Sequence, residues 1–181
     1  MYDAAVREFK RAGAADADIA AIIADAGVAR GTFYFHFPTK EHVLAELTDR
    51  EERSIADALR RKFRRSSHLT PNLAEVIRQV VSEEVKLGEL LFRDVLAFYF
   101  SSTFPAVTDS ATHPVAIVVI EQIDQAKARG EVYAGADAGA NGVFFLLGLY
   151  ALLATNRDPA SQRAVLLDKY LTGFVRGLET R

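Results

Sequence analysis

The sequence predicts an all-α protein of about nine helices. Apolar residues recur at spacings of three and four along almost every segment, whereas the alternation typical of strands is scarce. Glycine, proline and asparagine fall between these periodic runs, where helices are expected to end. The chain has 181 residues, of which 50% are hydrophobic and 25% charged, so it can bury a substantial core.

Three short helices are expected at the N-terminus, over residues 2–11, 19–26 and 30–35. Gly13 follows the first helix, because glycine accepts the positive φ of a helix end. Asp16 or Asp18 can cap the second helix, which ends at Gly27. Pro38 prevents continuation of the third helix because proline lacks a backbone N–H.

A long fourth helix is expected over residues 40–63, with Thr39 as its cap, and it connects two unequal units. The later helices are expected over residues 72–87, 89–102, 114–129, 138–155 and 160–178. We therefore expect a small N-terminal domain over residues 1–46 and a larger helical domain over residues 47–181.

The formal net charge is −2, so the chain has no overall basic field that would indicate nucleic-acid binding. A local basic segment exists at residues 26–40, which contain no acidic residue but include Arg30, His36 and Lys40. A second basic run, residues 60–65, is interpreted as cations favoured by the dipole at a helix C-terminus, with a nucleic-acid patch as the alternative.

Several kinds of protein are excluded by the sequence. Without cysteine the chain has no disulfide and no thiolate site, and a reducing cytoplasm is the expected location. No signal peptide is visible, and the longest apolar run, residues 143–154, is shorter than the ~20 residues of a membrane span. The chain also lacks the G-x-S-x-G, P-loop and G-x-G-x-x-G motifs, and its histidines lack metal-ligand spacing. We expect a soluble protein that is not an enzyme and has no metal, cofactor or membrane partner.

Residues 22–41 carry the most informative pattern. A helix-turn-helix requires small residues where its helices approach, a turn residue that tolerates unusual φ and an apolar anchor after the turn. Ala26, Gly27 and Val28 meet these requirements in order. On the next helix we expect Arg30, Thr32 and Tyr34 to point outward and Phe33 and Phe37 to point inward.

This stretch resembles the signature of the TetR family of transcriptional regulators, in which I-A-x-x-A-G-V-S-x-G-T-x-Y-x-[YH]-F-x-[ST]-K-E recurs. Ala5, Phe9 and Gly13 also follow the family spacing, so the strong resemblance covers the N-terminal domain. It implies a helix-turn-helix that binds double-stranded operator DNA and a C-terminal domain that dimerises and binds a small effector. The implied function is a ligand-responsive regulator, in most cases a repressor that its effector releases from the operator.

The resemblance assigns DNA contacts to Arg30, Gly31, Thr32, Tyr34, His36 and Lys40. Arg30 would contact a base or a phosphate, since arginine pairs bidentately with guanine O6 and N7 in the major groove. Gly31 would allow close approach of the backbone, and the polar side chains that follow it would donate hydrogen bonds to bases or phosphates. Lys40 would add positive charge beside phosphate oxygens.

The segment departs from the family pattern in its second and third helices. Ala29 stands where the family usually has serine, so a hydroxyl cap and phosphate donor is missing. Asp18 and Ile19 replace a threonine-led pair, and Ile23 replaces an alanine. We expect weaker phosphate anchoring and a slightly larger distance or angle between the two helices.

The aromatic residues of the third helix admit a second interpretation, an aromatic core cluster. We assign Phe33 and Phe37 to the core, and we assign Tyr34 and His36 to DNA because of the family spacing. Phe35 is left open between the two.

The resemblance also implies that the last two helices pair with their counterparts in a homodimer, and the sequence is compatible with this. Residues 143–153 are apolar on every side, and such a helix must be covered all round. Ala140, Gly148 and Ala151 would let helices approach closely. A symmetric dimer also suits DNA, because two recognition helices must lie ~34–36 Å apart to enter successive major grooves.

An aromatic-rich set in the larger domain is the candidate effector site, formed by Phe92, Leu96, Tyr99, Phe104 and Phe144. For each residue the alternative is an ordinary core position. The set favours a small apolar or aromatic effector. Two other functions stay open: a helical interaction module that does not bind DNA, and a regulator without a small-molecule effector.

Overall fold

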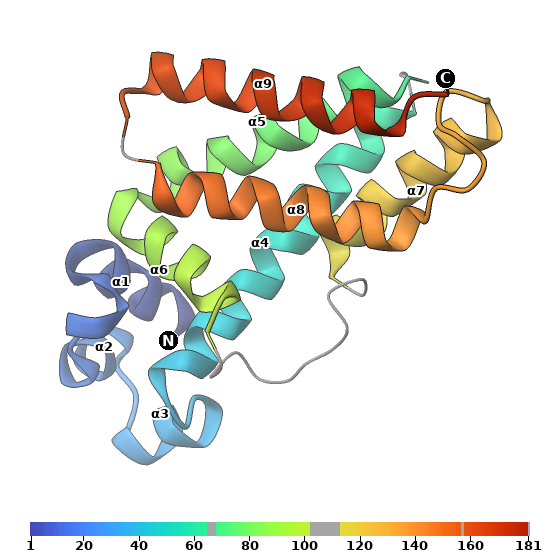
Figure 1. Ribbon diagram of the computed structural model, residues 1–181. Helices are drawn as coiled ribbons and strands as arrows, with labels where there is room; N and C mark the ends of the chain where they lie inside the picture. The colour runs from blue at the N-terminus through green and yellow to red at the C-terminus, as the bar shows by residue number, and fades with distance from the viewer. Residues whose placement is uncertain (65–67, 102–112, 157, 181) are drawn as a thin grey trace. The chain divides into compact units, whose positions relative to one another are not determined.

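The computed structural model describes residues 1–64, 68–101, 113–156 and 158–180. In these ranges the chain forms nine helices and no named strand (Figure 1). The helices are α1 (Tyr2–Asp16), α2 (Ile19–Ala26), α3 (Arg30–His36), α4 (Lys40–Phe63), α5 (Leu69–Leu87), α6 (Glu89–Tyr99), α7 (Pro114–Ala128), α8 (Ala138–Thr155) and α9 (Ala160–Leu178). The predicted all-α fold is confirmed.

The helices divide into two compact units, which are described separately. The first unit contains Met1–Glu51 and Ser82–Val107, and the second contains Glu52–Val81 and Thr108–Arg181. Helices α4 and α5 each belong partly to one unit and partly to the other. This division reflects packing within the chain, so a functional boundary near residue 46 stays a prediction.

The first four helices share one core in the first unit. Phe9, Ile22, Phe33 and Val43 come from α1, α2, α3 and α4 in turn, and each side chain is fully buried. Burying a side chain of this size contributes ~1.5–3 kcal/mol. The short helices α2 and α3 depend on this shared burial, because isolated helices shorter than ~12 residues are marginal in water.

Helix α1 extends past its expected end. The helical pattern is broken at Gly13, which has φ 79° and ψ 162°, and then resumes as far as Asp16. Asp94 on α6 explains the resumption, because its carboxylate accepts the backbone N–H of Ala14 at 2.6 Å. The glycine was predicted as a helix end, and the added turn depends on a residue 80 positions away in the sequence.

Two other helix ends differ from the sequence prediction. Helix α5 begins at Leu69, ahead of the expected residue 72, with Pro71 in its first turn. Proline is tolerated there because the first N–H groups of a helix have no partner within it. Helix α6 ends at Tyr99, before the expected residue 102, because Phe100 is its C-cap and Ser101 is not helical; residue 102 lies outside the described residues.

In the second unit α8 packs closely against α7 and α9, which lie beside it in Figure 1. A Cβ atom on Gly142 would lie 2.6 Å from the Ile120 side chain of α7, and one on Gly148 would lie 2.6 Å from the Tyr170 hydroxyl of α9. The Tyr170 hydroxyl donates a hydrogen bond to the Phe145 carbonyl. Gly148, which was expected to aid helix contact between subunits, therefore already accommodates a helix of its own chain.

Helix α8 is the one described helix that is long and apolar enough to cross a membrane by length and composition. The core helix of a soluble protein meets the same criteria. Within the chain, 39% of α8 is buried, and Phe145, Leu149 and Leu153 form part of the core.

Candidate nucleic-acid interface

Helix α2 is defined by a cap at each end. At its N-terminus the Asp18 carboxylate accepts the Ala20 backbone N–H at 2.7 Å. At its C-terminus Gly27 has φ 63°, and its N–H donates to the Ala24 carbonyl at 3.2 Å. The positive φ meets the requirement for a glycine in the turn between α2 and α3.

Polar contacts join α1 to α2. The Arg7 guanidinium contacts the Asp25 carboxylate at 2.7 Å. The Glu8 carboxylate, which is largely buried, accepts the backbone N–H of Asp18 at 3.0 Å and the guanidinium of Arg11 at 2.6 Å. These two hydrogen bonds, the one from Arg11 foremost, lower the pKa of Glu8 to about 2. The start of α2 is thus fixed to α1 through an ionised carboxylate.

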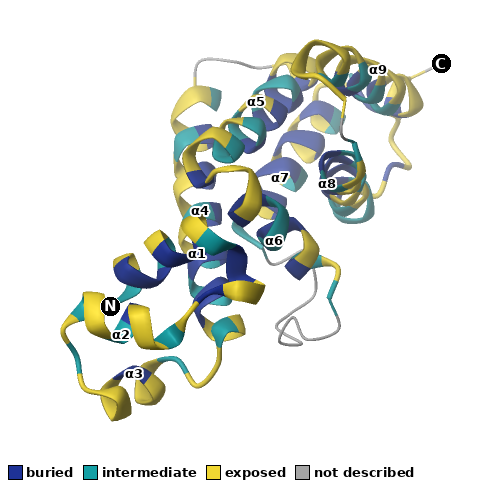
Figure 2. Ribbon diagram, turned by 90° about the vertical axis from the view of Figure 1, so that its left-hand side faces the viewer, coloured by how far each residue is buried: buried dark blue, intermediate teal, exposed yellow. Residues whose placement is uncertain are grey.

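Helix α3 has one inward side chain. Of its seven residues Phe33 is buried, and Figure 2 shows α3 exposed over most of its surface. The Phe33 ring packs 5.6 Å from the Tyr34 ring and 5.8 Å from the Phe37 ring, measured between centroids. No side chain caps α3, in agreement with the missing serine at Ala29.

The residues expected to contact DNA lie on α3 and at the start of α4. Arg30, Gly31, Thr32, Tyr34 and His36 are exposed, and Lys40 is half-buried. A Cβ atom on Gly31 would meet no other atom within 4 Å, so packing within the described chain does not require a glycine there. The Arg30 guanidinium carbon lies 5.5 Å from the centroid of the Tyr34 ring, within the range of a cation–π interaction.

Lys40 already has a partner within the chain. Its ammonium group donates a hydrogen bond to the carbonyl of Ala15, at the end of α1, at 2.7 Å. A cation at this position is favoured by the partial negative charge of a helix C-terminus. Lys40 therefore helps to hold the small domain together, and any phosphate contact must share or replace this bond.

Phe35 is a candidate interface residue that the sequence analysis left open. Its side chain is 84% exposed, and its ring meets the His36 ring edge-on at a centroid distance of 5.4 Å. Its outward direction follows from helix geometry, since Phe33 and Phe37, four residues apart, share the inner face and Phe35 lies opposite. Four-residue spacing was therefore the signal that could have identified it.

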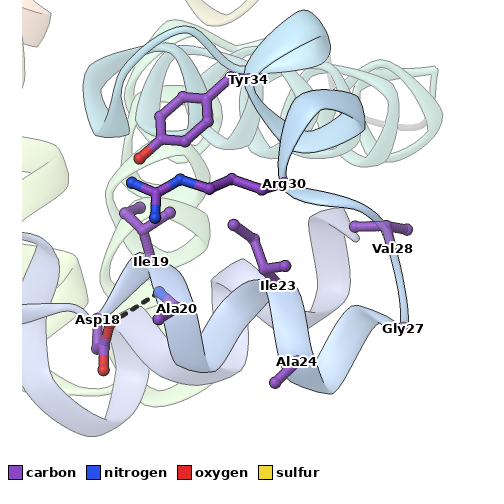
Figure 3. A pocket seen from close by; sticks show the side chains of 9 residues that line it. All are labelled: Asp18, Ile19, Ala20, Ile23, Ala24, Gly27, Val28, Arg30 and Tyr34. Atoms are coloured by element: carbon purple, nitrogen blue, oxygen red, sulfur yellow. Dashed lines mark hydrogen bonds between the residues drawn. The ribbon is translucent and has the colours of Figure 1, made fainter.

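A groove of about 500 Å³ runs between α2 and α3 (Figure 3). Its lining consists of Asp18, Ile19, Ala20, Ile23, Ala24, Gly27, Val28, Arg30 and Tyr34. The floor is mainly apolar, and Figure 3 shows the guanidinium of Arg30 extending over Ile19 towards the N-terminal end of α2. Ile23, which replaces the smaller alanine of the family pattern, lies in this groove.

The residues expected to bind an effector are divided between the two units. Phe92 and Leu96 are buried on α6 and Tyr99 is half-buried at its end, all in the first unit. Phe144, in the second unit, lies on α8 and is 63% exposed. Phe104 lies outside the described residues. Helix α6 thus brings the first three together, and an effector role for the set stays a prediction.

The described residues contain no group of three or more histidine, aspartate or glutamate side chains that could hold a metal ion. The geometry defines instead a helix-turn-helix: two short helices joined by a left-handed glycine, with the second anchored by one phenylalanine and otherwise exposed. This is the arrangement that places a recognition helix in the major groove of DNA.

Comparison with known proteins finds a family match in the N-terminal part of the chain. Residues 1–47 match the family described as "Bacterial regulatory proteins, tetR family". The match covers the segment in which the sequence analysis found the resemblance to this family, and it spans α1, the helix-turn-helix and the start of α4. No curated protein matches the chain.

Solved structures share the fold over nearly the whole chain. FadR from Bacillus subtilis, in complex with stearoyl-CoA, has a TM-score of 0.70 and 19% identity, and the alignment covers 98% of this chain and 97% of that one. A TetR-family regulator from Pectobacterium atrosepticum has a TM-score of 0.72 and 18% identity, covering 99% and 92%. RolR in complex with resorcinol has a TM-score of 0.75 and 15% identity, covering 98% and 84%. At these identities the likeness establishes the fold.

The contacts of Glu8 predict how the stability of the protein depends on pH. A carboxylate whose folded-state pKa is lowered to about 2 stabilises the fold above its ordinary pKa of 4.5, and this contribution is lost as the pH falls from about 4.5 to about 2. We expect the thermal unfolding midpoint of the wild type to fall more steeply across this window than that of Glu8→Gln. Glu121→Gln, which neutralises an exposed carboxylate on α7, is the control. Identical pH profiles for Glu8→Gln and the wild type would contradict the role of Glu8.

Proposed function

We propose that this protein binds operator DNA as a homodimer and represses transcription until a small apolar or aromatic effector releases it. Residues 1–46 would bind DNA, and residues 47–181 would dimerise and bind the effector. The exposed face of α3, supported by the single buried anchor Phe33, is the observation that carries the proposal. A regulator of this kind implies a cytoplasmic protein without enzymatic activity.

In this proposal α3 enters the major groove and Arg30 contacts a guanine. The Tyr34 ring beside the guanidinium limits its motion, which reduces the entropy lost when the arginine pairs with O6 and N7. Thr32 and His36 would donate hydrogen bonds to bases or phosphates. Phe35 presents an apolar ring, which suits contact with the methyl group of a thymine.

Selection of a binding sequence from a random duplex library, followed by mobility shift on the selected site and on the DNA upstream of the gene, tests the DNA-binding role. Arg30→Ala is expected to cost ~1–3 kcal/mol on the selected site and to relax base preference at one position. Lys40→Ala is expected to weaken binding to all sequences similarly. Equal loss on specific and random DNA for Arg30→Ala would contradict the proposed base contact.

A homodimer is supported by the incomplete covering of α8. Phe144 is 63% and Leu147 40% exposed, and with Ala151 they follow one another at helical spacing on a single face. Val165 on the neighbouring helix α9 is 56% exposed. Exposed large apolar side chains grouped in this way indicate an interaction surface, and a twofold axis through it would present two α3 helices to DNA.

Phe144→Glu is expected to convert the dimer to a monomer, because a carboxylate would be buried without a partner at the interface. Val85→Glu is the matched control, since Val85 is 88% exposed on α5 and lies outside the last two helices. Light scattering coupled to size exclusion measures the mass of each. A monomeric wild type, or a Phe144→Glu variant that stays dimeric, would contradict the proposed interface.

The effector is the second part of the proposal. Two structures with this fold were solved with ligands, stearoyl-CoA in FadR and resorcinol in RolR, each of which has an apolar or aromatic part. Phe92, Leu96 and Tyr99 on α6 are the aromatic and apolar side chains that we propose contact such a ligand.

Coupling between effector and operator is reciprocal in binding free energy. A compound that weakens operator binding by a given factor must itself bind more weakly, by the same factor, when the operator is present. Calorimetric titration of acyl-CoA and small phenolic compounds, with and without the selected duplex, measures both affinities. A bound compound with equal affinity in both titrations would contradict effector-controlled release.

An interaction module that no longer binds DNA is the competing function. It is favoured by Ala29, which leaves α3 without a side-chain cap, and by the modest net charge of −2. Binding to duplex DNA without preference over random competitor would favour this alternative.

A further inference from the structure

Asp18 occupies a fixed position at the N-terminus of α2. Its exposed carboxylate accepts the Ala20 N–H at 2.7 Å, and its own backbone N–H donates to the Glu8 carboxylate at 3.0 Å. Because both sides of the residue are bonded, its negative charge is held at the helix end.

Asp18 and Arg30 are the two charged residues in the described lining of the groove between α2 and α3. Figure 3 shows them on opposite helices, with the Arg30 guanidinium directed along the groove. Three cationic side chains of the small domain near α2 already have partners. Arg7 pairs with Asp25, Arg11 pairs with Glu8, and Lys40 bonds the Ala15 carbonyl.

The position of Asp18 has a consequence when α3 enters the major groove. In a helix-turn-helix the first helix of the pair crosses the sugar–phosphate backbone. A helix N-terminus normally attracts phosphate, because its free N–H groups and the helix dipole favour an anion. Here a carboxylate occupies one of those N–H groups and adds a negative charge, so the attraction is opposed at this end of α2.

We propose that Asp18 sets the DNA affinity of this protein by opposing phosphate contact at the N-terminus of α2. The inference rests on the proposed DNA-binding function and deepens it. Phosphates are present in every sequence, so the effect is independent of base sequence, unlike that of Arg30.

Asp18→Asn tests this proposal with little disturbance of the fold, because asparagine caps helices as well as aspartate. We expect the variant to bind a random-sequence duplex and the selected operator about three- to tenfold more tightly at low salt, with the ratio of the two affinities unchanged. The plot of log affinity against log salt should steepen by up to about 0.9 for each reading head, because one negative charge that opposes the phosphates is removed. Fluorescence anisotropy over a range of salt concentrations measures both quantities.

Asp16→Asn is the matched control, since Asp16 is exposed at the end of α1, carries the same charge and does not line the groove. It is expected to leave affinity near that of the wild type. Asp18→Ser, a second neutral cap, is expected to behave like Asp18→Asn and guards against misfolding of either variant.

Three results would overturn the proposal: unchanged affinity in Asp18→Asn, an equal gain in Asp16→Asn, or a gain confined to one base sequence, which would make Asp18 a base-reading residue. The random duplex separates this proposal from the proposed function. A wild type that selects no sequence, together with tighter random binding by Asp18→Asn, would refute the regulator and retain the inference. A wild type that selects an operator, together with unchanged DNA affinity in Asp18→Asn, would support the regulator and refute the inference about Asp18.

Discussion

The complete burial of the Phe33 ring is the interaction on which the DNA-binding surface depends. Helix α3 has seven residues, too few to be stable alone, and Phe33 is its one buried side chain. Its ring is fully buried, as are the side chains of Phe9, Ile22 and Val43 on α1, α2 and α4, so a single anchor orients the whole helix. The remaining positions of α3 are free of packing demands and are available for DNA.

Several charged side chains of the small domain form hydrogen bonds or ion pairs with other groups of the same domain. Glu8 joins α1 to the start of α2, and Lys40 joins α4 to the end of α1. With Asp18 at the groove, little unpaired positive charge is left for phosphate. In the proposed DNA complex, binding through such a surface would rely on directional contacts from α3 more than on bulk attraction, which agrees with the net charge of −2.

The larger unit contributes an apolar helix that its own chain covers incompletely. Phe145 and its neighbours on the inner face of α8 meet Tyr170 and Phe174 of α9, whereas Phe144 and Leu147 face outward. In the proposed homodimer, a second copy of the chain would satisfy both the burial of this face and the twofold symmetry of paired half-sites. Stability and DNA recognition would then depend on one interface.

The sequence by itself determined the helices, the glycine turn at Gly27 and the inward direction of Phe33, because these features depend on residues a few positions apart. The four-residue spacing of Phe33 and Phe37 also predicts that Phe35 points outward. The sequence analysis left Phe35 unassigned because aromatic residues occupy consecutive positions of this helix. Three features were decided by the tertiary structure alone. They are the extra turn of α1, which is bonded to Asp94, the close packing of Tyr170 against Gly148, and the hydrogen bond from Lys40 to the Ala15 carbonyl. Each of these contacts joins residues distant in sequence, so local periodicity carries no signal for them.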